Sequence, residues 1–244
     1  MDNDTPSAGA LFLVATPIGN LEDITLRALR VLREADVIYA EDTRRTRILL
    51  DKFSIAKHLE SYHIFNEHGR TPELLKRVSQ GEKVVLVSDA GMPCIADPGF
   101  LLVRSAVEAG IRPVIIPGVS ALTFSVAVSA LPSDSFTYYG FLPVKSGRRS
   151  SVLRRIAEEG RTAVIFESPF RIAKLLDEIF HIIGPETAVA IVREATKVHE
   201  EVLRGTAEEL LSQTSARSWK GEIVVVLHPP ENAGTTVSEE SQPE

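Results

Sequence analysis

The feature that most constrains the fold is a regular alternation of short β-rich runs with helical segments in the first half of the chain. The expected strands are 11–15, 37–40, 58–62, 83–87 and 112–116. Helical patterns fill the intervals between them, at 25–35, 43–53, 71–80 and 98–109. Strands that alternate with helices of this length are typical of a mainly parallel sheet covered on both faces. The first half is therefore predicted to be an α/β domain.

The second half alternates in the same way at first and then changes. Its expected helices are 118–131, 147–159, 169–183 and 207–211, and its expected strands are 136–140, 161–167, 188–192, 198–204 and 222–227. Because strands follow one another near the end, we expect a mixed sheet here. The sequence thus predicts two α/β domains, residues 11–117 and 118–228.

Three polar–proline pairs look like helix starts, with an N-cap side chain followed by proline at the first helical position. They are Thr71-Pro72, Asp97-Pro98 and Ser168-Pro169.

Charge is unevenly distributed along the chain. There are 27 Lys and Arg against 33 Asp and Glu, a formal net charge of −6. Residues 1–10 and 229–244 hold six of the acids and none of the basic residues. These two ends are polar and rich in Pro, Ser, Thr, Asn and Gly, so we predict that they are disordered tails. The remaining body has no net charge, which neither requires nor forbids a polyanionic partner.

The composition excludes several classes of protein. Cys94 is the single cysteine, so there is no disulfide framework and no cysteine-based zinc site. No apolar run approaches the roughly 18 residues of a membrane span, and the polar start does not resemble a signal peptide. We expect a cytoplasmic protein that does not enter the membrane.

Common catalytic motifs are also missing. Neither the P-loop pattern nor the G-x-G-x-x-G dinucleotide fingerprint occurs. Gly118-Val119-Ser120 begins like a nucleophile elbow but lacks its second glycine. His58, His63 and His68 are spaced by five residues, which suits neither a helix face nor a strand face. We therefore expect no metal site.

Three loops rich in glycine and proline follow expected strands of the first domain, at 15–20, 88–99 and 116–121. In an open parallel sheet, ligands bind at the carboxyl ends of the strands, where small residues let the backbone approach closely. The loops lack the basic residues of a phosphate site. Asp89 and Asp97 instead suit a cationic or hydroxyl-rich ligand.

Seven segments stand out as motifs: residues 13–25, Ala40-Glu41-Asp42-Thr43-Arg44, residues 88–93, Asp97-Pro98-Gly99, residues 117–121, residues 166–171 and residues 193–197. Together these segments resemble the family of ribosomal RNA small subunit methyltransferase I, in the tetrapyrrole methylase superfamily. The resemblance implies two α/β domains, S-adenosylmethionine as cofactor, and 2′-O-methylation of a cytidine ribose in small-subunit (16S) ribosomal RNA. It also implies a homodimer.

The superfamily's cofactor contacts can be transferred onto this chain position by position. They fall on Ile18, Asp89, Ala90, Gly91, Cys94, Ser120, Ala121, Glu167 and Ala195. Two positions depart from the usual pattern: Ile18 replaces a proline, and Asp89 lies two positions before the superfamily's own aspartate. Core packing is the alternative interpretation of Cys94 and Ala195.

A ribose hydroxyl needs a base or a stabilising cation before it attacks a methyl group. The candidates are the carboxylates Glu41, Asp42, Asp89 and Glu167 and the cation Lys197. We favour Glu41, with Asp42 and Lys197 as the other catalytic candidates. Asp42 would alternatively cap the helix that begins at Thr43.

An RNA substrate, either free small-subunit RNA or an assembled 30S subunit, requires clustered positive charge. Residues 41–57 hold five basic side chains, among them Arg44 and Arg45, and residues 145–161 hold six, among them Arg148 and Arg149. The segment 145–150 is expected to be a flexible basic loop. Aromatic residues that could stack a base, or pack in the core, are Phe136, Tyr138, Tyr139 and Phe141.

Two other functions fit the same fold: methylation of a tetrapyrrole carbon or a protein side chain, and RNA binding without catalysis. The absence of a Gly-x-Gly-Pro-Gly first loop and the presence of Arg44, Arg45 and Arg47 favour the RNA methyltransferase.

Overall fold

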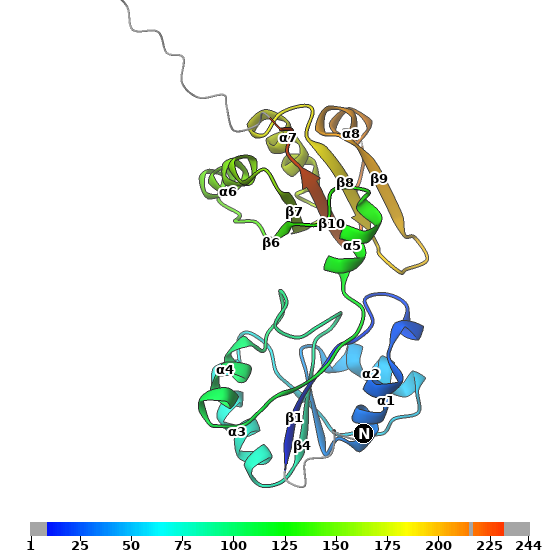
Figure 1. The fold of residues 1–244 in the computed structure, drawn as a ribbon. Coiled ribbons are helices and arrows are strands. Elements are labelled where there is room, and N and C mark those ends of the chain that lie inside the picture. Colours follow the sequence, from blue (N-terminus) through cyan, green and yellow to red (C-terminus); the bar gives the residue numbers. More distant parts are fainter. Residues whose placement is uncertain (1–8, 215–216, 232–244) are drawn as a thin grey trace, which may run out of the picture. The chain divides into compact units, whose positions relative to one another are not determined.

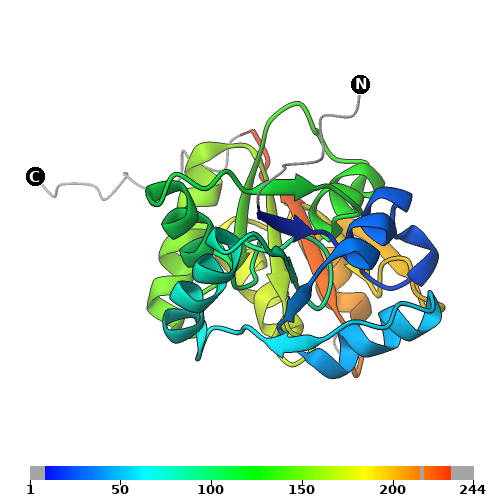
Figure 2. The same ribbon diagram turned by 90° about the horizontal axis from the view of Figure 1, so that it is seen from below.

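The computed structural model describes residues 9–214 and 217–231, and its chain divides between Ser120 and Ala121 into two units. We call these unit 1 and unit 2, and their elements can be followed in Figures 1 and 2. The predicted division lay at 117/118. Ala10 was assigned to a disordered tail, but it begins the first strand and is buried. The rest of both predicted tails, apart from Gly9 and residues 229–231, lies outside the described residues.

Unit 1 is built on a five-stranded parallel sheet. Its strands are β1 (Ala10–Val14), β2 (Val37–Ala40), β3 (Leu59–Ser61), β4 (Lys83–Val87) and β5 (Val114–Ile116), in the order β3-β2-β4-β1-β5. Every pair in this order is parallel. All strands therefore end at the same side of the sheet, which we call the carboxyl edge of unit 1.

Helices cover both faces of this sheet: α1 (Leu26–Glu34), α2 (Thr43–Lys52), α3 (Glu67–Ser79) and α4 (Phe100–Glu108). A short 3-10 helix, η1 (Leu21–Asp23), precedes α1. Successive strand residues point to opposite faces. Phe12 and Val14 accordingly pack with α1 and α2, whereas Leu11 and Leu13 pack with α3 and α4. Two buried faces explain why β1 is apolar throughout.

Unit 2 contains a mixed five-stranded sheet in the order β6-β7-β10-β8-β9. The strands are β6 (Phe136–Phe141), β7 (Thr162–Glu167), β8 (Ala188–Arg193), β9 (Glu201–Thr206) and β10 (Ile223–His228). Only the β6–β7 pair among them is parallel. The predicted fold class, a parallel first sheet and a mixed second one, is confirmed.

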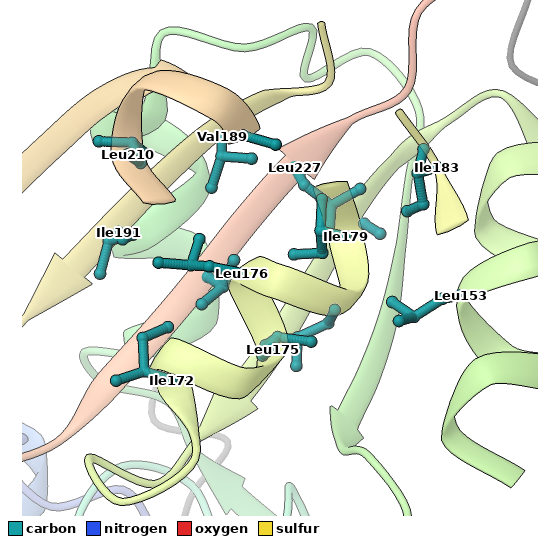
Figure 3. Packing of buried hydrophobic residues seen from close by; sticks show 14 of the residues in the cluster. Leu153, Ile172, Leu175, Leu176, Ile179, Ile183, Val189, Ile191, Leu210 and Leu227 are labelled. Atoms are coloured by element: carbon teal, nitrogen blue, oxygen red, sulfur yellow. The ribbon is translucent and has the colours of Figure 1, made fainter. Parts of the chain in front are cut away.

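The helices of unit 2 are α5 (Ala121–Ser129), α6 (Ser146–Glu159), α7 (Ile172–Ile182) and α8 (Ala207–Thr214). Figure 3 shows Ile172, Leu175, Leu176 and Ile179 of α7 in the core against the sheet. This helix therefore buries one apolar face against the sheet. The opposite face of the sheet is covered by α5. No helix in the described part of the chain is long and apolar enough to cross a membrane.

All three helix starts predicted from polar–proline pairs are wrong. Thr71 and Pro72 lie inside α3, because the Thr71 hydroxyl pairs with Tyr62 Oη at 3.0 Å instead of capping a helix. Gly99 precedes α4, two residues after Asp97. Ser168 accepts a hydrogen bond from Phe170 N, and α7 begins only at Ile172.

Candidate functional site

The loops after β1 and β4 are joined to each other at the carboxyl edge of unit 1. Thr16 N donates to Gly91 O at 2.8 Å, and Gly91 N donates to Thr16 O at 3.0 Å. The Thr16 hydroxyl also donates to Ser88 O at 3.1 Å. The loop after β5 begins beside them, since Ala15 N donates to Ile116 O at 3.1 Å. Three loops expected to form a ligand site are thus brought together, because β4, β1 and β5 are neighbours.

Gly91 lies at the centre of this arrangement with a φ of +85°. Left-handed backbone of this kind is strained for other residues. A Cβ at Gly91 would lie 3.5 Å from Ile18 Cγ2 and 4.0 Å from Val119 O, which is ordinary contact. The backbone angle rather than crowding is therefore what requires glycine.

The other transferred cofactor contacts of unit 1 have different environments. Ile18 is buried and Ala90 is half-buried. Cys94 packs against the core between the sheet and α3–α4, and burial raises the pKa of its thiol to about 11. A thiol with a raised pKa is a weak nucleophile at neutral pH. Ser120 ends unit 1, and Ala121 begins α5 of unit 2.

Glu41 follows β2 at the same carboxyl edge and is half-buried. Burial raises the pKa of its carboxyl group, and the negative charge of Asp89 raises it further. The charges of Arg45 and His63 act in the opposite direction. A carboxylate with a raised pKa is a stronger base than an ordinary surface glutamate.

Asp89 organises the turn that carries Glu41. Its Oδ1 accepts a hydrogen bond from Asp42 N at 2.9 Å, and its Oδ2 lies 3.6 Å from Arg45 Nε. β2 and β4 are neighbours, so residues 47 positions apart meet here. In this structure Asp89 holds the β2–α2 turn, a role that the sequence did not suggest.

Asp42 caps α2 and pairs with Arg44. Its Oδ1 accepts from Arg44 N at 2.9 Å, and its Oδ2 lies 2.6 Å from Arg44 Nη2. The hydrogen bonds from Arg44 lower the pKa of Asp42 to about 2. The capping alternative describes this environment, and a carboxylate so strongly held is a weak base.

Glu167 ends β7 in unit 2 and is buried. Its Oε1 accepts from Ser168 N at 2.6 Å and lies 2.7 Å from Arg171 Nη2. Oε2 is buried without a hydrogen-bond partner among the described residues. An unpaired buried oxygen is costly in the folded protein.

Lys197 lies in the loop after β8, between two carboxylates. Its Nζ donates to Glu194 Oε1 at 2.8 Å and to Glu222 Oε2 at 3.1 Å. Burial acts to lower the pKa of Lys197, but these two carboxylates raise it overall, so the amine stays charged. Ala195, in the same loop, packs against the α5 side of the sheet. Glu222 was missed from the sequence, because nothing local marks a residue 25 positions away as a partner.

The arginines expected to bind RNA fall into two classes. Arg44 and Arg45 are exposed on α2, with 89% and 61% of their side chains accessible. Arg148 is exposed too, but Arg149 is buried and forms an ion pair with Glu178 of α7. Residues 146–150 are the first residues of α6, with Lys145 at the N-cap position, rather than a flexible loop. The prediction that Arg149 meets phosphates is wrong, because its side chain is buried and paired with Glu178.

The aromatic residues named from the sequence all lie on β6, whereas the histidines lie around β3 and the start of α3. His58 pairs with Glu60 at 3.3 Å, and within the described ranges no cluster of His, Cys, Asp and Glu could hold a metal ion. Tyr139 donates to Glu159, and Tyr138 packs against Phe166 at the sheet. Phe136 and Phe141 are exposed on β6.

Solved structures share this fold at low sequence identity. Diphthine synthase gives a TM-score of 0.72 at 19% identity, over 90% of each chain. The uroporphyrin-III C-methyl transferase of Thermus thermophilus, complexed with S-adenyl homocysteine, gives 0.64 at 21%, over 89% of this chain and 97% of that one.

Sequence relatives are closer. The model of the Tetrapyrrole (Corrin/Porphyrin) Methylases matches residues 10–211. Ribosomal RNA small subunit methyltransferase I of Thermotoga maritima is 49% identical over 219 residues, which is 90% of this chain and 98% of that protein. Its namesake in Escherichia coli O157:H7 is 44% identical over 91% of this chain and 78% of its own length. The chain therefore belongs to the tetrapyrrole methylases and, within them, to the family of ribosomal RNA small subunit methyltransferase I.

Proposed function

We propose that this protein transfers a methyl group from S-adenosylmethionine to the 2′-hydroxyl of a cytidine in small-subunit (16S) ribosomal RNA. The names of its relatives support the RNA substrate. The observation that carries the chemistry is the half-buried Glu41, with its raised pKa, beside the exposed Arg44 and Arg45. A base and a phosphate-binding surface at one sheet edge are what ribose methylation requires.

The residues of unit 1 fit S-adenosylmethionine, which supplies an electrophilic methyl group when it is bound. Gly91 keeps the backbone of its loop bare beside Ile18 and Val119, so a ligand can approach main-chain groups closely. Backbone recognition of this kind explains why small residues such as Ala90 and Gly91 occupy this loop. In unit 2, the unpaired Glu167 Oε2 is a suitable acceptor for a hydroxyl or amino group.

Glu41 is the proposed general base. Its raised pKa makes it able to accept the ribose proton, while Asp89 and Arg45 hold the turn on which it lies. Lys197 is the alternative catalytic group, as a cation that would stabilise the developing alkoxide. A normal rate for Glu41→Gln together with loss of turnover in Lys197→Ala would move the assignment to unit 2.

RNA binding is proposed for Arg44, Arg45 and Arg148, and the protein is proposed to be a cytoplasmic homodimer. Light scattering after size-exclusion chromatography tests the dimer. A mass equal to one chain of 26.7 kDa would contradict it.

Radiolabelled S-adenosylmethionine is incubated with small subunits that lack this modification, with free 16S RNA, or with a tetrapyrrole precursor. We expect label in the RNA, recovered as 2′-O-methylcytidine after digestion to nucleosides. The more active of the two RNA substrates identifies the natural one. Label in a base, in protein or in the tetrapyrrole would refute the proposed reaction, and binding without labelling would indicate a non-catalytic protein.

A further inference from the structure

Phe65 is the most exposed large apolar side chain in the described part of unit 1, with 94% of its surface accessible, and its neighbour Ile64 is 64% exposed. Both lie in the turn between β3 and α3, at the carboxyl edge. Such a pair of exposed apolar residues is a candidate contact surface.

This turn lies beside the proposed base. Tyr62 N donates to Ala40 O at 2.8 Å, so the pairing of β2 with β3 continues to the last residue before Glu41. His63 follows Tyr62 directly, and its charge acts to lower the pKa of Glu41. The residues after β2 and those after β3 therefore share one part of the edge.

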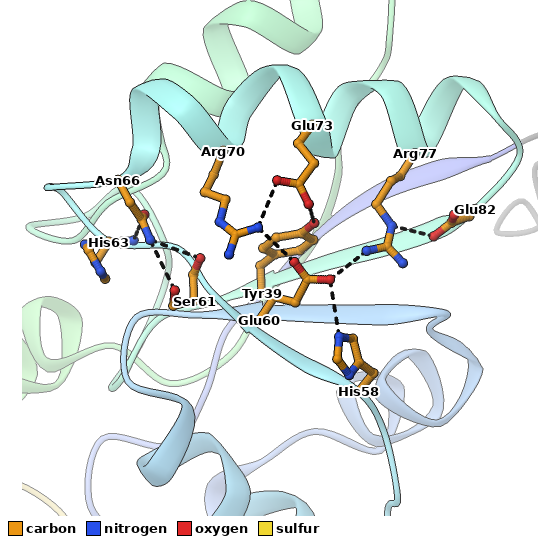
Figure 4. A network of polar contacts seen from close by, with 10 residues as sticks. All are labelled: Tyr39, His58, Glu60, Ser61, His63, Asn66, Arg70, Glu73, Arg77 and Glu82. Atoms are coloured by element: carbon orange, nitrogen blue, oxygen red, sulfur yellow. Dashed lines mark hydrogen bonds and ion pairs between the residues drawn. The ribbon is translucent and has the colours of Figure 1, made fainter.

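Hydrogen bonds hold the turn in a single conformation. Asn66 Oδ1 accepts from His63 N at 2.8 Å, and Asn66 Nδ2 donates to Ser61 O and to Ser61 Oγ, each at 3.2 Å. Figure 4 shows these residues together at the start of α3. The rings of His63 and Phe65 meet edge to face, with centroids 6.1 Å apart. Phe65 is thus presented outward by a fixed backbone, which lowers the entropy lost when a ligand covers it.

The helix behind the turn is also anchored. Glu60 of β3 pairs with Arg70 of α3 at 3.1 Å and with Arg77 of α3 at 2.7 Å. Tyr39 of β2 donates to Glu73 of α3 at 3.4 Å. These contacts, drawn in Figure 4, tie α3 to β3 and to β2, the strand that leads to Glu41.

The surroundings favour a nucleobase over an apolar protein surface. Arg44 and Arg45 start α2, the helix that follows Glu41, and both are exposed. An exposed aromatic ring and exposed guanidinium groups on neighbouring turns of one sheet edge suit a nucleotide, whose base stacks on an aromatic face while its phosphate pairs with cations. A stable protein contact would need a far larger apolar area than two side chains provide.

We propose that Phe65 is a stacking platform for a nucleobase of the RNA substrate, either the target base or one next to it. The proposal rests on the proposed function. Stacking here would hold the ribose of that nucleotide beside the Glu41 turn, and the platform would contribute to the choice of target.

The test compares wild type, Phe65→Ala and Phe65→Trp in binding a short labelled oligocytidylate, followed by fluorescence anisotropy. We expect about 5- to 150-fold weaker binding for Phe65→Ala, the range measured for loss of one stacked base, and near-normal binding for Phe65→Trp. The salt dependence should not change, because no phosphate contact is lost. Val107→Ala, which trims a side chain that is 62% exposed in the last turn of α4, is the matched control and should bind normally.

A second probe, the same sugar–phosphate chain without bases, separates stacking from electrostatics. Wild type and Phe65→Ala should bind it equally. Equal binding of oligocytidylate by both proteins would overturn the proposal, as would equal losses on the two probes. If Phe65→Ala bound more weakly only to assembled subunits, and not to oligocytidylate, the Phe65 ring would contact a ribosomal protein instead of a base. A wild-type protein that binds oligocytidylate through Phe65 but methylates no ribosomal RNA would refute the proposed function and leave the platform intact.

Discussion

Replacing Arg149 tests whether this residue belongs to the core or to the RNA-binding surface. Arg149 Nη2 lies 2.6 Å from Glu178 Oε1, and its Nε pairs with the other carboxylate oxygen. The two side chains are only 3% and 10% exposed. Arg149→Met keeps the apolar stem but leaves the Glu178 carboxylate buried without its partner. Breaking a buried pair in this way destabilises a protein by about 3–5 kcal/mol.

Urea unfolding followed by tryptophan fluorescence measures this loss directly. Trp219 is the sole tryptophan of the sequence and is buried in the same core cluster as α6 and α7, so its emission reports on unit 2. In a thermal melt the expected loss corresponds to about 6–20 °C, at roughly 2–4 °C per kcal/mol for a chain of this size. Arg148→Met is the matched control, since Arg148 is exposed and its loss should change stability by less than about 0.5 kcal/mol.

A double replacement makes the test sharper. Arg149→Met combined with Glu178→Leu removes both charges, and we expect it to recover most of the lost stability. A single Arg149→Met variant that loses less than about 1 kcal/mol, and that binds RNA as weakly as Arg148→Met, would refute this reasoning. Arg149 would then be assigned to the RNA-binding surface, as the sequence predicted.

Three further variants provide the remaining predictions: Glu41→Gln, Gly91→Ala and Gly221→Ala. Glu41→Gln should lower the methylation rate by about 10²–10⁴-fold at saturating cofactor. In a pH–rate profile, the wild-type rate should begin to fall at a higher pH than the protonation of a glutamate with an ordinary pKa would give. Because folding raises the pKa of Glu41, ionisation of this carboxyl group opposes folding. Glu41→Gln should therefore be as stable as the wild type or slightly more stable at neutral pH. The difference in stability should vanish at pH values below the usual pKa of glutamate. Gly91→Ala should cost about 1–2 kcal/mol in urea unfolding through its positive φ and should weaken S-adenosylmethionine binding in calorimetry, whereas unchanged affinity would place the cofactor elsewhere. Gly221→Ala would put a Cβ 2.4 Å from Glu194 Oε1, so it should displace that carboxylate from Lys197 and lower stability more than Gly91→Ala does.

Local sequence pattern was sufficient for the elements buried on both faces. The strands 37–40 and 83–87 have the bounds that were predicted, because a short apolar run between turn residues has little choice of conformation. Helix starts were the weak point. Thr71 has the side chain of an N-cap, but a hydrogen bond to Tyr62 in the folded core uses that hydroxyl instead.

The candidate site was predictable in position more than in role. Loops after parallel strands had to meet at one edge, so Glu41, Asp89 and Gly91 were correctly expected at the carboxyl ends of their strands. What each carboxylate does depends on its neighbours in space. Asp42 is held by Arg44 and Asp89 supports the turn of Asp42, and the second contact exists only because β4 lies next to β2.

Arg148 and Arg149 show most clearly the difference between what the sequence predicts and what the tertiary structure decides. By sequence they are adjacent residues of one type in one basic segment, and pattern alone indicated a charged surface. In the structure one is exposed and the other is buried against Glu178, 29 positions further along. The sequence by itself determined the two α/β units, the strand ends that carry the candidate site and the family to which the chain belongs. The distant partners of Arg149 and Asp89 were decided only by the tertiary structure, because a buried charge is stable only where folding brings an opposite charge to it.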